Sequence, residues 1–287
     1  MSTFAYILRN GDKGQEVARL QRTLGELSVD GSFGNLTEAA VREYQTTHCL
    51  GVDGAAGPET LGRLCIPVHA AIDVSAYQGD IDWEAVAASG VIAVWIKVTE
   101  GRTHVNKGWR SRFYGAKSAG LFVGAYHFSR PDTNSSKRDA EREATHFLEA
   151  CKAVGLHNFD LAPANDFEKG LKHDDQYNVD WMNDWNNVVR PRFQMPVLMY
   201  TAKWAYQLYA QSASRDSILQ LTRNPLWWAR YKGDVEPTNS VSPWDEWSVW
   251  QYSGSASVPG VKGKCDVNWL SGDALTRLTR NTQEANA

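Results

Sequence analysis

The sequence predicts an α/β protein, in which a barrel of eight short strands follows a small all-α unit of three helices. Three observations lead to this prediction. Short apolar runs alternate with amphipathic stretches from residue 70 onward, all 12 tryptophans lie after residue 80, and one short motif near the start occurs twice. A chain of 287 residues is long enough for one large and one small domain.

Composition and charge exclude several classes of protein. Hydrophobic residues make up 43% and charged residues 22% of the chain, as in a soluble globular protein. The formal net charge of −3 argues against nucleic acid as a partner, because proteins that bind it usually carry a basic face. No apolar run approaches the roughly 20 residues needed to cross a bilayer, so we expect no membrane insertion.

Metal and cofactor sites are not indicated either. The four cysteines (Cys49, Cys65, Cys151 and Cys265) lack Cys-x-x-Cys spacing, and the seven histidines include no His-x-x-x-His pair. We therefore expect free thiols, no metal and no cofactor. His127 lies inside an apolar run and is expected to be a hydrogen-bonded wall residue, and a serine nucleophile is unsupported because no Gly-x-Ser-x-Gly motif occurs.

The first 66 residues contain the repeated motif. "VDGSFGNLT" (29–37) is followed 23 residues later by "VDGAAGPET" (52–60). Each copy combines an Asp-Gly turn with a threonine that can cap the next helix, and apolar residues at helical spacing occupy 11–27 and 38–45. About three helices with two similar loops are predicted for residues 1–66, followed by a linker at 67–71. Taken alone, Asp-Gly segments are more often plain turns than binding loops.

The motif as a whole resembles the peptidoglycan-binding domain found at the ends of many cell-wall hydrolases, over nearly all of residues 8–64. The matching positions are Gly11, Gly14, Val17, Leu20, Gln21, Val29, Asp30, Gly31, Phe33, Gly34, Thr37, Ala40, Val41, Tyr44 and Gln45. The resemblance implies a wall-binding role for Asp30, Phe33 and Tyr44. Ala56 replaces Phe33 in the second loop, so a second equal site is not expected.

Eight apolar runs are the candidate strands of the barrel, which we expect over residues 72–287. They are 70–75, 91–99, 121–129, 159–168, 196–201, 226–231, 247–253 and 263–269. Helical stretches such as 82–90 and 137–155 separate the first five, and this alternation favours a parallel sheet. Loops rich in Trp, Pro and Gly join the last three, so the barrel is expected to be irregular over its final third.

Four carboxylates are associated with these strands. Asp73 ends the first run, Asp166 and Glu168 end the fourth, and Asp266 lies in the last. Catalytic groups of (β/α) barrels lie at the carboxyl ends of strands, so the four are expected to converge at one mouth. Residues two apart on a strand share a face about 6–7 Å apart, and like charges that close raise one pKa. Each acid alone is more often a helix cap or salt-bridge partner, but the set of four favours a functional site.

Glycosidic cleavage needs this combination of groups. It requires a protonated acid for the leaving oxygen and negative charge near an oxocarbenium-like centre. Sugar rings also pack on aromatic side chains. Five aromatic residues lie in or just after candidate strands, either lining a sugar groove or filling the barrel core: Tyr77, Tyr126, Tyr200, Trp228 and Trp250.

Residues 70–272 closely resemble the glycoside hydrolase family 25 lysozymes. The resemblance is carried by Asp73-Val74-Ser75-x-Tyr77-Gln78-Gly79-x-Ile81-Asp82-Trp83, Tyr126-His127-Phe128, Asp166-x-Glu168, Met199-Tyr200-Thr201, Trp250-Gln251-Tyr252 and Asp266-Val267-Asn268. It implies an irregular, TIM-like (β/α)5β3 barrel. It also implies an N-acetylmuramidase that cleaves the β-1,4 bond between N-acetylmuramic acid and N-acetylglucosamine in peptidoglycan.

The resemblance also implies roles for single residues. Glu168 is the general acid/base, and Asp166 polarises the substrate's N-acetyl group or stabilises the transition state. Asp73 and Asp266 add negative potential and orient sugar hydroxyls, in a retaining and substrate-assisted reaction. Substrate-binding roles fall on Tyr77, Gln78, Tyr126, Tyr200, Trp228, Trp250 and Gln251. Asn165 stands where the family more often has an apolar residue, which predicts altered hydrogen bonding beneath Asp166.

Two other functions stay open. One is a cell-wall-binding protein without catalysis, and the other is a chitinase-like enzyme or N-acetylglucosaminidase. Because "MSTFAYILRNGDKG" (1–14) lacks the features of a secretory signal, we expect synthesis in a host cytoplasm and action on the bacterial wall, in the periplasm, after release. A monomeric phage endolysin that depends on a holin fits this setting, and a secretion-system effector is the alternative.

Overall fold

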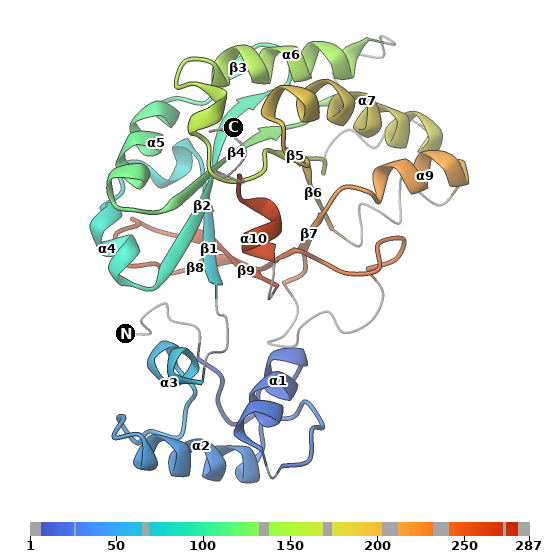
Figure 1. Ribbon diagram of the computed structural model, residues 1–287. Coiled ribbons are helices and arrows are strands. Elements are labelled where there is room, and N and C mark those ends of the chain that lie inside the picture. Colours follow the sequence, from blue (N-terminus) through green and yellow to red (C-terminus); the bar gives the residue numbers. More distant parts are fainter. Residues whose placement is uncertain are drawn as a thin grey trace, which may run out of the picture.

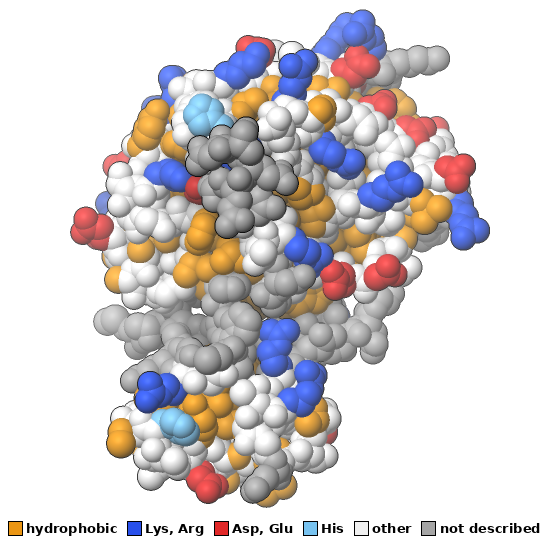
Figure 2. Space-filling model, viewed as in Figure 1, with side chains coloured by type: hydrophobic (Ala, Val, Ile, Leu, Met, Phe, Trp, Pro, Cys, Tyr) orange, Lys and Arg blue, Asp and Glu red, His pale blue; other side chains and the backbone are white. Residues whose placement is uncertain are grey.

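The computed structural model describes residues 7–25, 27–64, 69–131, 138–168, 174–202, 212–231, 241–271 and 274–280. These residues form two separate hydrophobic clusters, a small one among the first three helices and a large one in the sheet and its surrounding helices. The small helical unit lies apart from the helices that surround the sheet (Figure 1). On the face shown in Figure 2, acidic and basic side chains are interspersed.

The small unit contains the three helices that the sequence predicts. They are α1 (Gln15–Leu24), α2 (Asn35–Thr47) and α3 (Pro58–Arg63). Their apolar faces meet in a core made of Leu8, Val17, Leu20, Phe33, Val41, Ala56 and Leu61. Backbone bridges join Leu8 to Ala56 and Lys13 to Ser32, so the two loops are also tied to the segment before α1.

The two copies of the repeated motif fold around two buried glutamines. Gln21 of α1 donates from Nε2 to Asp30 Oδ1 (2.8 Å) and to Thr37 Oγ1 (3.1 Å), and its Oε1 accepts from the Gly31 N–H (2.9 Å). Gln45 of α2 makes the matching bonds in the second copy, to Asp53 Oδ1 (2.8 Å), Thr60 Oγ1 (3.1 Å) and the Gly54 N–H (2.9 Å). The repeat therefore satisfies buried polar groups in the same way twice.

Eight strands close into a barrel. They are β1 (His69–Val74), β2 (Val91–Glu100), β4 (Phe122–Phe128), β5 (Ala164–Asp166), β6 (Leu198–Ala202), β7 (Leu226–Ala229), β8 (Val249–Ala256) and β9 (Cys265–Leu270). The spatial order is β1-β9-β8-β7-β6-β5-β4-β2, and the β1–β2 pairing closes the ring. The short strand β3 (His104–Val105) pairs with β2 outside the ring.

Helices follow each of the first five barrel strands. These helices are α4 (Trp83–Ala88), α5 (Trp109–Ser118), α6 (Asp139–Cys151), α7 (Asp175–Phe193) and α9 (Arg215–Leu221), and they lie outside the sheet (Figure 1). The other described helical segments are η1 (Ala76–Gln78), η3 (Leu156–Asn158) and α10 (Ala274–Leu278). The (β/α)5β3 prediction is confirmed. No helix among the described residues is long and apolar enough to span a membrane.

The last strand departs from a simple parallel barrel. β1, β2 and β4 to β8 all run parallel to one another, whereas β9 runs antiparallel to its two neighbours, β8 and β1. Only residues 257–264 separate β8 from β9, and so short a connection permits only antiparallel pairing. Asp266 therefore lies near the start of its strand and not at its carboxyl end, where catalytic groups of such barrels are expected.

Two predicted boundaries also change. β1 begins at His69, so residues 69–71 of the predicted linker belong to the barrel sheet, and 67–68 lie outside the described residues. The fourth apolar run, 159–168, forms a strand only at Ala164–Asp166, because Pro163 has no N–H to donate to a ladder.

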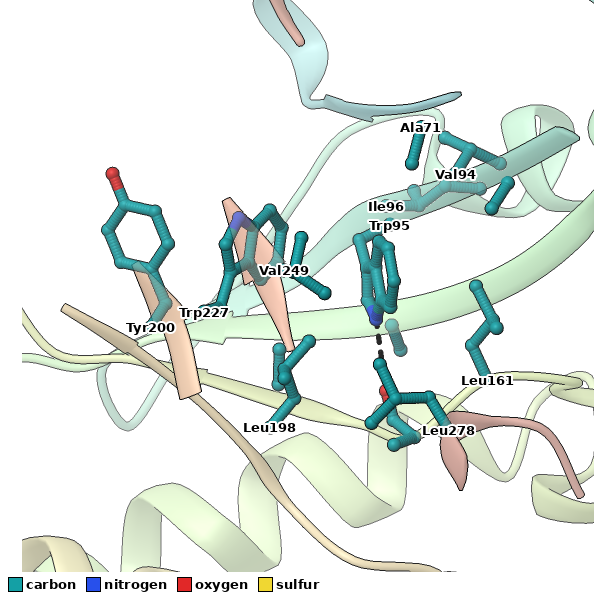
Figure 3. Packing of buried hydrophobic residues seen from close by; sticks show 14 of the residues in the cluster. Ala71, Val94, Trp95, Ile96, Leu161, Leu198, Tyr200, Trp227, Val249 and Leu278 are labelled. Atoms are coloured by element: carbon teal, nitrogen blue, oxygen red, sulfur yellow. Dashed lines mark hydrogen bonds between the residues drawn. The ribbon is translucent and has the colours of Figure 1, made fainter. Parts of the chain in front are cut away.

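The barrel interior is filled by large side chains (Figure 3). Trp95 of β2 and Trp227 of β7 lie 5.1 Å apart between ring centroids, and Tyr200 of β6 packs edge-on against Trp227 at 5.2 Å. The Trp95 indole donates to the Ala162 carbonyl oxygen (3.0 Å), so its polar atom is satisfied although the ring is fully buried. These packed rings fill the barrel, so its interior is a core and not an open channel.

Candidate active site

A cleft of about 510 Å³ lies at the carboxyl ends of the parallel strands. Its lining residues come from the barrel strands, from η1 and from the β8–β9 loop: Asp73, Ser75, Tyr77, Gln78, Lys97, Tyr126, Phe128, Asp166, Glu168, Tyr200, Trp227, Tyr231, Gln251, Gly254, Lys262, Gly263, Lys264 and Asp266. All four predicted carboxylates are among them. The volume is in the range of sites that hold a small organic ligand.

Asp166 and Glu168 reach the cleft together because the residue between them turns away. Phe167 is fully buried and packs on Trp181 of α7 at 5.6 Å between ring centroids. The alternation of side chains along an extended chain then places the two acids on the opposite side, toward the cleft. Asp73 and Asp266 face each other as register partners of β1 and β9.

Asp73 is held by two amide side chains. Gln251 Nε2 and Asn268 Nδ2 both donate to Asp73 Oδ2, at 2.8 and 2.9 Å. The Gln251 carbonyl accepts from Tyr200 (2.8 Å) and Tyr231 (2.5 Å). These contacts fix the orientation of both carboxylate and amide.

The second amide is fixed in a similar way. Asn268 Oδ1 accepts from the Trp227 indole N–H (2.7 Å), so its Nδ2 is turned toward Asp73. Asn268, Trp227 and Tyr231 were not singled out as site residues from the sequence. Asn268 stands two residues after Asp266, and that spacing on a strand was the available signal.

The pKa values of the buried acids are raised. Burial, and then the charge of Asp266, raises the pKa of Asp73 well above its usual value, although the two amide bonds lower it. Burial followed by the charge of Glu168 likewise raises the pKa of Asp166, whose Oδ1 is buried without a hydrogen-bond partner in the described part of the chain. Burial also raises the pKa of Asp266. The cleft thus favours carboxyl groups that keep a proton.

Lys97 of β2 is one of the three lysines that line this acidic cleft in the described part of the chain. The Lys97 ammonium group lies 2.8 Å from Glu100 Oε2 and 4.3 Å from the centroid of the Phe128 ring. Its charge lowers the pKa of Asp166, in opposition to burial and to Glu168. In the sequence, Lys97 is the single charged residue of the apolar run "VIAVWIKVT" (91–99). It was not predicted to be a site residue.

The chain is similar to known proteins over both of its parts. The model of the glycosyl hydrolases family 25 matches residues 72–261, which is well over half of the chain. The chain belongs to glycosyl hydrolase family 25. A second model, of a peptidoglycan binding domain, matches residues 13–64.

Individual relatives agree with the family. Lysozyme M1 of Streptomyces globisporus is 29% identical over 235 residues, which cover 79% of this chain and 77% of that protein. The autolytic lysozyme of Clostridium acetobutylicum is 32% identical over 201 residues, covering 70% of this chain and 55% of that protein. The crystal structure of a bacterial lysozyme from Streptomyces coelicolor superposes with a TM-score of 0.62 at 25% identity, covering 74% of this chain and 95% of that one.

Most of the predicted sugar-binding residues of the family 25 barrel line the cleft, but two tryptophans do not. Tyr77, Gln78, Tyr126, Tyr200 and Gln251 are lining residues, and Tyr77 is 96% exposed.

Trp228 and Trp250 are buried away from the cleft, so their expected placement in a sugar groove is wrong. They are register partners on β7 and β8 and therefore share a face of the sheet, opposite to the face of Trp227 and Gln251. Trp250 instead donates its indole N–H to the Arg230 carbonyl oxygen (3.1 Å).

The side chains behind the cleft form their own polar contacts. His127 of β4 is fully buried, and burial lowers its pKa to about 3, so the ring is neutral at pH 7. Its Nε2 lies 2.8 Å from Glu143 of α6 and its Nδ1 2.8 Å from Thr99, as expected of a hydrogen-bonded wall residue. Asn165 accepts from Ser129 (2.6 Å) and donates to Asn186 of α7 (3.2 Å), on the side of β5 away from the cleft.

The residues predicted to bind the wall have different surroundings. Phe33 is 1% exposed in the core of the helical unit, which corrects its expected contact with the wall. Asp30 is exposed, although its Oδ1 also accepts from the Ser32 N–H (2.8 Å), and Tyr44 stacks on His48 at 3.9 Å. Ala56 occupies in the second loop the core position that Phe33 occupies in the first.

Proposed function

We propose that this protein is a peptidoglycan hydrolase, an N-acetylmuramidase (lysozyme) that cleaves the β-1,4 bond between N-acetylmuramic acid and N-acetylglucosamine. The observation that carries the proposal is the cluster of four carboxylates in the cleft of a family 25 barrel. Lysozymes are among the relatives of the chain, and a module matched to peptidoglycan binding precedes the barrel. A pure binding protein would not need to bury acids whose pKa values are raised.

The chemistry follows from the environments of the two central acids. Glu168 is half-buried at the cleft and donates its proton to the glycosidic oxygen as the general acid. In its ionised form, which the positive charge of Lys97 favours, Asp166 stabilises the oxocarbenium-like centre or polarises the substrate's N-acetyl group. Water then completes a retaining reaction with Glu168 as base. Both acids come from one segment, which suits an intramolecular nucleophile supplied by the sugar.

The remaining site residues position this pair and the sugar. Asp73 and Asp266 add negative potential and accept from sugar hydroxyls. Gln251 acts as a positioning residue, because its amide is already bonded to Asp73, Tyr200 and Tyr231. Tyr77, Gln78, Tyr126 and Tyr200 contact the glycan, and the exposed ring of Tyr77 offers a flat surface to a sugar face.

The helical unit docks the enzyme on its polymeric substrate. Linking a binding module to a catalytic module raises the local concentration of the second site once the first is bound. Asp30 and Tyr44 remain the proposed contacts of this module. We place the enzyme as a monomer that acts at the bacterial wall, with no role for nucleic acid.

The biological setting is that of a phage endolysin which reaches the wall from the host cytoplasm through a holin. The arrangement of a wall-binding module before a catalytic barrel supports it. Expression in a bacterial host separates this setting from the alternative, a secreted effector. Lysis only after co-expression of a holin supports the endolysin, and growth inhibition that depends on a secretion system supports the effector.

The reaction itself is tested by product analysis. Purified peptidoglycan is digested, new reducing ends are reduced with borohydride, and the products are identified by mass spectrometry. New muramitol ends are the expected result. New glucosaminitol ends would keep the glycosidase chemistry and replace the bond, in favour of an N-acetylglucosaminidase. No new ends despite retention on the same wall material would favour the binding-only function.

A further inference from the structure

Two lysines stand at the rim of the acidic cleft. Lys262 and Lys264 flank Gly263 in the loop between β8 and β9, and both side chains are exposed and line the cleft. The exposed ring of Tyr77 lines the same cleft, and Gln78 of η1 donates to the Lys264 carbonyl oxygen (3.2 Å). The loop that carries the lysines therefore contacts η1, the segment that carries Tyr77.

The ammonium groups of Lys262 and Lys264 are unpaired within the described part of the chain. Neither Nζ has an ion-pair or hydrogen-bond partner there, whereas Lys97, Lys117 and Lys152 each lie within 2.8 Å of a carboxylate oxygen. Four acids line the same cleft, yet none of them lies within ion-pairing distance of either rim lysine in that part of the chain. Both cations are thus available to a ligand.

The loop that carries the lysines is anchored. The Asp82 N–H donates to the Gly260 carbonyl oxygen (2.9 Å), and the Val261 N–H donates to that of Val258 (3.0 Å). Gly260 has a φ of +86°, and a Cβ there would lie 2.2 Å from the Asp82 carbonyl oxygen, so the loop backbone packs tightly on the start of α4. Such anchoring holds Lys262 and Lys264 at the cleft mouth.

The positive charge of the two lysines suits this rim to an anionic ligand. Those acids of the cleft that are ionised repel a ligand that carries a carboxylate, so a cleft for an anionic glycan needs compensating cations where the substituent emerges. A neutral glycan of N-acetylglucosamine needs none. N-acetylmuramic acid differs from N-acetylglucosamine by a 3-O-lactyl group, which carries either a free carboxylate or a stem peptide with its own carboxylates.

We propose that Lys262 and Lys264 bind the carboxylates borne by the 3-O-substituent of muramic acid, and that this rim selects muramic-acid-containing glycans over neutral ones. The proposal rests on the proposed function and deepens it by assigning substrate selection to two residues outside the catalytic acids. Tyr77 packs on the sugar face beside them.

Binding can be measured separately from catalysis. Calorimetry in a Glu168→Gln background, which prevents turnover, gives the Kd of three ligands of equal length. They are a peptide-free N-acetylglucosamine–N-acetylmuramic acid hexasaccharide, the same glycan with stem peptides, and chitohexaose. Each is titrated into the full chain with and without Lys262→Gln/Lys264→Gln. The control is Lys107→Gln/Lys152→Gln, which removes the same charge from exposed lysines that do not line the cleft.

The rim variant is expected to raise the Kd of the anionic ligands about tenfold, since each exposed charge pair contributes modestly. The Kd of chitohexaose should stay unchanged, and the control should bind all three ligands like the parent. An effect on the peptide-free glycan identifies the lactyl carboxylate as the contact, and an effect confined to the peptide-bearing glycan identifies the stem peptide.

An unchanged Kd for both anionic ligands, or an equal loss for chitohexaose, would overturn the proposal. Circular dichroism and thermal melts of every variant establish that each is folded. The product analysis reports the bond that is cleaved, independently of these affinities, so failure of the proposed function and failure of the lysine rim are distinguishable.

Discussion

At the scale of single residues, the side chain between the two acids decides their arrangement. Phe167 is buried against Trp181, so Asp166 and Glu168 are both turned to the cleft. Their surroundings then make them unequal. Asp166 is buried and the charge of Lys97 lowers its pKa, whereas Glu168 is only half-buried. Two acids in different environments can take different roles in one reaction.

Glu168→Gln is expected to lower the turnover number on peptidoglycan at least about 100-fold, because the amide cannot donate the proton that the leaving oxygen needs. The release of reducing ends measures this. Glu149→Gln, an exposed carboxylate on α6, is the matched control and should retain activity. Near-normal turnover by correctly folded Glu168→Gln protein would refute the assignment.

Lys97→Met is expected to change the pH dependence of the reaction. The Lys97 charge lowers the pKa of Asp166, so its removal raises that pKa further, and a larger fraction of Asp166 is protonated at acidic pH. If ionised Asp166 is required, the acidic limb of the kcat/KM profile moves to higher pH. Lys97→Arg keeps the charge and should keep the limb in place. A uniform loss of rate at every pH would instead indicate a structural role for Lys97.

At the scale of elements, the direction and face of each strand decide which residues meet. β9 runs antiparallel, and this brings the start of the strand, with Asp266 and Asn268, to the end of the barrel where Asp73 lies. On β7, adjacent tryptophans point to opposite faces, so Trp227 enters the barrel and Trp228 does not. The close packing around Trp95 leaves little space beside β4.

Gly124→Ala is expected to destabilise the barrel by about 1–3 kcal/mol, the usual cost of overpacking. A Cβ at Gly124 of β4 would lie 2.5 Å from the Trp95 indole and 3.1 Å from Leu161 Cβ. Urea denaturation of Gly124→Ala, Trp95→Phe and the double variant tests the cause. The smaller ring should reduce the cost of the added methyl group, whereas strictly additive free energies of unfolding would show that Trp95 is not the obstacle.

At the scale of the whole molecule, the buried acids of the site destabilise the folded state when they ionise. The buried acids Asp73 and Asp166 have raised pKa values in the folded protein, so the folded state holds protons that the unfolded state releases. Their ionisation therefore destabilises the fold as pH rises from the ordinary carboxyl pKa of about 4 through the raised value. His127 acts in the opposite direction, because its lowered pKa makes the fold lose stability as pH falls from about 6.5 toward about 3.

Asp166→Asn is expected to raise the Tm of the barrel at pH 7, while it lowers activity. At this size each kcal/mol gained corresponds to about 2–4 °C. The advantage over the wild-type protein should shrink below about pH 4, where Asp166 is protonated in both the folded and the unfolded state. Calorimetric scans between pH 3 and pH 8 measure the difference, from which the shared contribution of His127 cancels. An unchanged Tm at pH 7 would contradict a destabilising Asp166 charge.

The sequence by itself determined the order of strands and helices, the family and the four acids, because these depend on local periodicity and on motifs of neighbouring residues. Only the tertiary structure decided that Trp227 rather than Trp228 lines the cleft. It also decided that Lys97 stands near Asp166 and that Gln21 and Gln45 hold the two loops of the helical unit. The physical reason is common to these cases. Which face of an element turns inward, and which distant element packs against it, follows from burial of the whole chain and not from any one stretch of it.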